Sequence, residues 1–136
     1  MINDIKAAKS CLDVIKAFTD ASGYGLAVDG TEYAPATNET YIYESYIVND
    51  NDQGLPNSAS QIQLPIYQLS VFVPKSQNKW ALGNLVEQVK AVFARATDIS
   101  NDANQKVIIN SVDSSQVKST ETHLYQTLRV NLTIIG

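Results

Sequence analysis

The sequence is poor in the residue types that most often carry chemistry. It has one cysteine, Cys11, and one histidine, His123, among 136 residues. A lone cysteine excludes an intrachain disulfide, and one cysteine with one histidine leaves too few ligands for a zinc site. Cys11 lies on a predicted helix, where we expect a small, partly buried hydrophobic side chain. His123 begins a predicted strand, where we expect an ordinary exposed residue.

Long apolar segments are also absent. No run approaches the ~18 residues that a membrane-spanning helix requires. The N-terminal residues 1–18 are amphipathic and charged, so they lack the apolar centre of a secretory signal. We therefore expect synthesis and folding in a cytoplasm, with no membrane association. The glycosylation sequons that begin at Asn38 and Asn131 are then chance matches.

Positive charge is scarce. Ten Lys and Arg residues stand against 14 Asp and Glu residues, which gives a net charge of −4. The basic residues are scattered, whereas direct nucleic-acid binding needs a basic stripe that displaces counterions from phosphates. The composition therefore predicts no specific nucleic-acid binding, although an acidic protein could still form the wall of a passage for DNA.

Two patterns resemble functional loops without meeting their requirements. Residues 49–54 match part of a calcium loop, but Asn49 stands where the first Asp is needed and Ser60 where the bidentate Glu is needed. The glycines Gly23 and Gly25 follow a helix rather than a strand, so they indicate a helix end and not a dinucleotide site. No phosphate-binding loop or nucleophile–base pair is present. The sequence therefore predicts no enzyme, no metal and no cofactor.

Hydrophobic periodicity predicts an α+β protein that forms a single domain over residues 1–136. Helices are expected over 3–19 and 78–96, because apolar residues recur there at spacings of three and four. Pro65 cannot donate to a ladder, so it predicts an edge position or a bulge. The order α-β-β-α-β-β predicts two helices packed on one face of a mostly antiparallel four-stranded sheet. The expected strands are 40–48, 62–73, 106–112 and 123–135.

Polar segments connect these elements. Residues 26–39 are expected to be irregular, with a turn at Asp29-Gly30. Residues 49–61 are almost entirely Asn, Asp, Gln, Gly, Pro and Ser, which predicts a long flexible hairpin loop between the first two strands. Residues 113–122 form a second loop, rich in Ser and Thr. Loops of this length often carry function, so both become candidate contact segments.

The remaining positive features suit contacts between subunits. Seven tyrosines are present, and tyrosine packs through its ring while its hydroxyl stays hydrated. The alternation of the last strand predicts one buried face and one polar face. Trp80 could anchor a partner surface, although packing against the sheet edge is favoured. The candidate interface residues are Asp50, Asp52, Leu55, Tyr43, Trp80, Tyr125 and Arg129.

The order of these features resembles the phage tail-terminator family over nearly the whole chain. An amphipathic N-terminal helix (IKAAKSCLDVIKAF) is followed by a proline-containing segment (EYAPATNETYIYESYIV) and a polar insertion. A strand that ends in YQLSVFVP then precedes a helix (KWALGNLVEQVKAVF) and a last strand with RVNLTI. The succession of strand, Val73-Pro74 and helix is the most characteristic part.

This resemblance implies a structural protein of the bacteriophage virion, located at the neck of a long tail. It implies a hexameric ring that caps the tail tube and stops its polymerisation during tail assembly. The implied partners are further copies of the chain, the tail tube protein and the head–tail connector protein, while DNA passes through the ring. Two alternatives stay open: another neck or head–tail joining protein of the same particle, and a small-ligand-binding α+β domain with a deep polar pocket.

Overall fold

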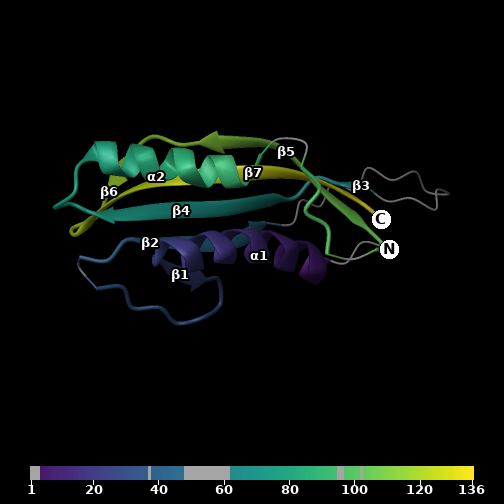
Figure 1. The fold of residues 1–136 in the computed structure, drawn as a ribbon, viewed down its shortest axis with the longest axis horizontal. Coiled ribbons are helices and arrows are strands. Elements are labelled where there is room, and N and C mark those ends of the chain that lie inside the picture. The colour runs from purple at the N-terminus through teal and green to yellow at the C-terminus, as the bar shows by residue number, and fades with distance from the viewer. Residues whose placement is uncertain (1–3, 37, 48–61, 95–96, 102) are drawn as a thin grey trace.

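The structure, a computed structural model, describes residues 4–36, 38–47, 62–94, 97–101 and 103–136. It confirms the α+β class with two helices and a mostly antiparallel sheet (Figure 1). The predicted four strands are too few, because the described residues form seven. In chain order the elements are α1 (Asp4–Ser22), β1 (Gly25–Val28), β2 (Tyr41–Ile47), β3 (Ile62–Gln63), β4 (Ile66–Pro74), α2 (Lys79–Val92), β5 (Lys106–Ser114), β6 (Lys118–Ser119) and β7 (His123–Ile135).

The last strand is the hub of the sheet. The path runs β1-β2-β4-β7, and β7 also pairs with β3, β5 and β6. Since β4 and β5 both pair with residues 128–131, they flank β7 on opposite sides. β6 and β4 both pair with residues 124 and 125, so β6 lies on the β5 side of β7. β3 and β5 both pair with residues 134 and 135, so β3 lies on the β4 side. All of these pairings are antiparallel except β1 with β2, which is parallel.

Two strands lie where the sequence predicted loops. β1 begins at Gly25 and runs into the expected irregular segment 26–39, and β6 falls inside the expected loop 113–122. A four-residue strand is too short to show a period, and both residues of β6 are exposed. Each exists through its pairing with a longer strand rather than through local preference. The expected turn at Asp29-Gly30 is confirmed, with the φ angle of Gly30 at 85°.

Proline divides the second predicted strand. The segment expected over 62–73 forms β3 and β4, which are separated by Leu64 and Pro65. Pro65 has no N–H to give to the ladder, so pairing stops there, while its carbonyl still accepts from the Leu132 N–H at 3.1 Å. The predicted pairing of 40–48 with 62–73 is confirmed as β2 with β4, in the register Ile47 to Ile66.

Both helices cover the same face of the sheet, as predicted. Their apolar stripes join one hydrophobic cluster with alternate residues of β4 and β7. Cys11 is fully buried in this cluster, deeper than expected. We call the opposite side of the sheet the outer face. The residues of the cluster from the two helices are Ala7, Cys11, Ile15, Leu82, Leu85, Val86, Val89 and the adjoining Phe93.

The ends of the helices have local causes. α1 ends at Ser22 because the next residue, Gly23, has a φ of 76°, and its N–H bonds the Thr19 carbonyl at 2.8 Å. α2 begins at Lys79 after the N-cap Asn78, whose side-chain oxygen accepts from the N–H groups of Trp80 and Ala81 at 3.0 and 3.1 Å. It ends at Val92, earlier than predicted, because the chain returns to pair Asp98 with Ile108 of β5.

Candidate functional site

Polar side chains gather on the outer face, as the alternation of the last strand predicts. The hydroxyls of Ser70 on β4 and Thr127 on β7 share a hydrogen bond of 3.1 Å. Next along β7, the Asn131 amide donates to Ser111 and to Asp113 of β5, both at 2.9 Å. Since these bonds cross strands, they hold the polar groups of the face in fixed positions.

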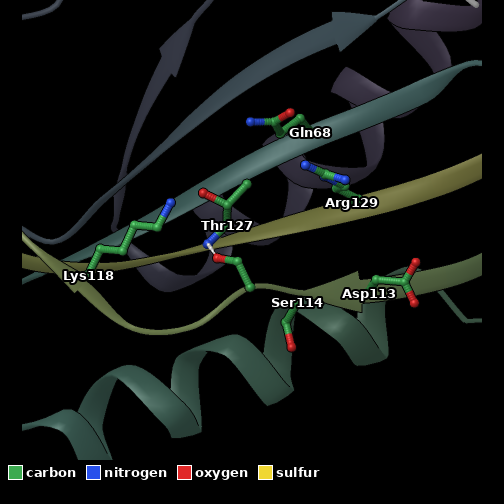
Figure 2. Close-up of a pocket in the computed structure, with 7 residues that line it drawn as sticks. Gln68, Asp113, Ser114, Lys118, Thr127 and Arg129 are labelled. Carbon is green, nitrogen blue, oxygen red and sulfur yellow. Dashed lines mark hydrogen bonds between the residues drawn. The ribbon is translucent and has the colours of Figure 1, made fainter.

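A hollow of ≈ 340 Å³ lies on this face where β5 leaves β7 (Figure 2). After Ser114 the chain turns away, and Ser115 keeps contact by donating its N–H to the Thr127 carbonyl at 2.8 Å. The chain rejoins β7 at β6, which opposes Leu124 and Tyr125. The hollow is the space between the point where β5 leaves β7 and the point where β6 rejoins it. It is lined by Gln68, Asp113, Ser114, Ser115, Lys118, Thr127 and Arg129.

Two cations in the hollow are unneutralised. Within the described ranges, the side chains of Lys118 and Arg129 have no ion-pair or hydrogen-bond partner. Asp113 stands opposite Arg129 in the strand register, but its carboxylate accepts from Asn131 instead. Figure 2 shows the guanidinium of Arg129 directed toward Gln68 and the Asp113 carboxylate turned away. The hollow is therefore suited to an anionic group.

Aromatic rings occupy the other end of the outer face. Phe72 of β4 stacks between Tyr41 and Tyr125, with ring centroids 4.5 and 4.8 Å away. Tyr33 continues the row from the segment after β1, 5.7 Å from Tyr41. Tyr125, a predicted interface residue, is thus half-buried and packed within the chain. These rings make a rigid apolar border to the polar half of the face.

His123 is buried, so the prediction of an exposed residue is wrong. It is 3% exposed and meets the Tyr41 ring edge-on at 5.3 Å. The connection from β1 to β2 crosses this end of the outer face, and the Glu39 carbonyl lies 2.8 Å from His123 Nε2. Parallel pairing requires such a crossover, and no local sequence pattern predicts the pairing of β1 with β2. The Nδ1 atom is occupied as well, 2.7 Å from the Thr122 hydroxyl.

Of the predicted interface residues that the structure describes, Tyr43, Tyr125 and Arg129 lie on the outer face, whereas Trp80 lies on the helical side. Tyr43, 41% exposed on β2, donates its hydroxyl to Asp29 at 3.0 Å. Trp80 opens α2 and is 70% exposed, with the Lys79 ammonium 5.2 Å from its ring centroid. The favoured packing of Trp80 against the sheet edge is therefore wrong. Arg129 lines the hollow. The predicted residues Asp50, Asp52 and Leu55, with the loop 49–61, lie outside the described residues.

The inner face of the sheet contains a buried carboxyl group. Glu44 of β2 is 6% exposed, and its Oε1 accepts from the Asp29 N–H at 3.1 Å. Burial, followed by the charge of Glu44, raises the pKa of the Cys11 thiol to about 12. Burial also raises the pKa of the Tyr67 hydroxyl, with the neighbouring Glu44 as the next cause. A buried thiol that keeps its proton is a poor nucleophile.

Other kinds of site find no support in the described parts of the chain. No group of three His, Cys, Asp or Glu side chains gathers there as a metal site would need. Neither α1 nor α2 has the length and apolar character to cross a membrane. The carboxylates Glu44 and Glu87 do not share an element or an environment, as an acid/base pair would: Glu44 is buried on β2, and Glu87 is exposed on α2 beside Lys90. The outer face is thus the part of the described surface with the most developed polar geometry.

One polar, uncovered face is ordinary for a mostly antiparallel sheet whose other face packs against helices. A solved protein structure shares this fold: it aligns with 91% of this chain and 94% of its own, with a TM-score of 0.61 and 13% identity. No curated protein sequence matches the chain. The family model described as phage tail terminator protein matches residues 5–131.

The chain belongs to the phage tail terminator family. Membership makes it a structural protein of the phage tail, located in the virion. It also implies contacts with other tail or virion proteins. The resemblance found in the sequence is thereby confirmed at the level of the family.

Proposed function

We propose that this chain is a tail terminator subunit that forms a hexameric ring on the finished tail tube. The ring stops tube polymerisation and offers a surface to the head–tail connector. The family match over residues 5–131 carries this proposal. The match covers nearly all of the given chain, so we expect the protein to function through surface contacts with other proteins.

The outer face supports a role in assembly. A closed ring requires two different patches on each subunit, because each copy contacts two neighbours through unlike surfaces. The described surface offers distinct candidates. Arg129 lies in the hollow of the outer face, whereas Trp80 stands exposed at the start of α2 on the helical side. Aromatic and Arg side chains are the residues that most often dominate interface energies.

The protein is proposed to act without catalysis. Its single thiol is buried and keeps its proton, and both ring nitrogens of its single histidine are engaged. A net charge of −4 favours a passage along which DNA slides without binding. The proposed partners are therefore proteins: further copies, the tube protein and the connector protein.

Loss of the gene tests the proposal. We expect a phage lacking this chain to make tails of uncontrolled length, and the wild-type chain supplied in trans to restore a uniform length. Tail lengths are measured by negative-stain electron microscopy. A head–tail joining protein would behave differently, leaving tails of normal length detached from heads. That outcome would replace the terminator role with another place in the neck.

A further inference from the structure

The basic residues are distributed unevenly along this chain, which the net charge alone does not show. All ten Lys and Arg residues lie within residues 1–16 and 75–136. The intervening residues 17–74 contain no basic residue, while acidic residues continue through them. Of the described elements, β1, β2, β3 and β4 fall in this stretch. One part of the sheet is therefore built without any positive charge.

The strand order converts this division into a division in space. β1 is the edge of the path β1-β2-β4-β7, so two strands separate it from β7. The cations Lys118 and Arg129 lie on β6 and β7, and β6 pairs with β7 on the side away from β4. Figure 1 shows β1 and β6 on different sides of the central strands. The sheet itself thus has an acidic edge at β1 and a basic hollow on the other side of β4, while Lys9 and Lys16 of α1 lie beside β1 on the helical side.

The acidic edge presents a rigid turn. Residues 29–32, which we call the acidic turn, follow β1 and carry the exposed carboxylates Asp29 and Glu32. The Val28 carbonyl accepts from the N–H and the hydroxyl of Thr31 at 3.0 and 2.6 Å. Buried Glu44 holds the Asp29 N–H, as described above. A turn fixed in this way loses little conformational entropy when it binds.

We propose that the acidic turn of one copy docks into the hollow of the next copy, with Asp29 and Glu32 against Lys118 and Arg129. The contact joins unlike patches on opposite sides of the subunit, which is the head-to-tail arrangement that a ring requires. Arg129 offers a planar fork that matches a carboxylate, and Lys118 adds a second donor. This inference rests on the proposed ring and names the contact that builds it.

Paired charge reversal tests the contact in solution. The variant K118E/R129E has an acidic hollow, and the variant D29K/E32K has a basic turn. Each variant alone then opposes like charges at every contact, so we expect self-association roughly tenfold or more weaker than wild type. In an equimolar mixture, acidic turns meet basic hollows and basic turns meet acidic hollows. The mixture is therefore expected to recover association. Sedimentation velocity over a range of protein and salt concentrations measures each case.

Matched variants separate this contact from a general effect of charge. K16E/K75E and D20K/E87K change the net charge equally at exposed positions outside the turn and the hollow, and we expect them to associate as wild type. Circular dichroism confirms that every variant is folded. The proposal is overturned if wild type stays monomeric, if the reversals leave association unchanged, or if the mixture fails to recover. A chain that associates through this contact yet fails to limit tail length would keep the contact and overturn the terminator function.

Discussion

His123 and Glu39 are joined across 84 positions of sequence by a hydrogen bond of 2.8 Å. The acceptor is the backbone carbonyl of Glu39, so Nε2 must carry the proton and Nδ1 accepts from the Thr122 hydroxyl. Through this bond the last strand holds the connection between β1 and β2 against the outer face. His123 thus has a structural role that cannot be predicted from its residue type alone.

Replacing this histidine should lower stability in two separable steps. His123→Phe keeps the aromatic packing but leaves the Glu39 carbonyl without its donor, at a cost of about 1 kcal/mol. His123→Ala also removes the ring beside Tyr41, and we expect a total loss of about 2–4 kcal/mol. Urea unfolding followed by circular dichroism measures both. Equal stability of the alanine variant and wild type would show that the bond does not anchor the crossover.

The buried thiol should make the protein sensitive to alkali. Burial raises the pKa of Cys11 from 9.0 to about 12 in the folded state. The folded protein then holds a proton that the unfolded chain releases, so this contribution to stability is complete below pH 9 and is lost as pH rises toward 12. We expect a loss of up to ~1.4 kcal/mol per pH unit from this group.

Cys11→Ala provides the control for this pH dependence. Between pH 9 and pH 10, urea unfolding of the alanine variant should show a shallower loss of stability than wild type, even though the variant is less stable throughout. Ellman's reagent should likewise react with the wild-type thiol only after unfolding. Parallel pH profiles of the two proteins would contradict the assignment.

The cap of α2 makes a local prediction. The side-chain oxygen of Asn78 accepts from the N–H groups of Trp80 and Ala81 in the first turn of the helix, and the Ala81 N–H also bonds the Asn78 carbonyl at 3.1 Å. Asn78→Ala should therefore cost about 1 kcal/mol of stability. Asn84 is an exposed residue of the same helix, and Asn84→Ala serves as the matched control with little expected change. The two variants are compared by their thermal midpoints.

Substitution of Trp80 distinguishes an effect on assembly from an effect on stability. Because the side chain is 70% exposed, Trp80→Ala should change the free energy of unfolding by less than about 0.5 kcal/mol. If Trp80 anchors a partner, the same variant should fail to restore uniform tail length when supplied in trans. Trp80→Phe, which keeps an aromatic ring, should restore it in part. A fully functional alanine variant would remove Trp80 from the proposed interface.

The long strand β7 was predictable with its observed bounds, because thirteen residues alternate between apolar and polar side chains. The same alternation predicts that His123 points to the polar outer face, which is correct. It also predicts that His123 is exposed, which is wrong. What covers His123 is the crossover that ends at Glu39, and this depends on a parallel pairing between strands that no local pattern reveals.

The hollow was predictable in part, through Arg129 and through the loop 113–122, which contains Asp113, Ser114, Ser115 and Lys118. Its other cation, Lys118, lies on a two-residue strand with no apolar pattern. The hollow itself arises where β5 leaves β7, beyond an irregularity in their register between Ile109 and Ser111. Such a departure is a relation between two strands, so the residues that line the space cannot be grouped from one-dimensional periodicity.

The position of β7 as the hub has a consequence for biosynthesis. Every one of its partners, β3, β4, β5 and β6, precedes it in the chain. During translation these strands leave the ribosome before the strand that joins them, so the sheet closes only when β7 emerges. Nascent chains therefore lack the complete outer face until that moment.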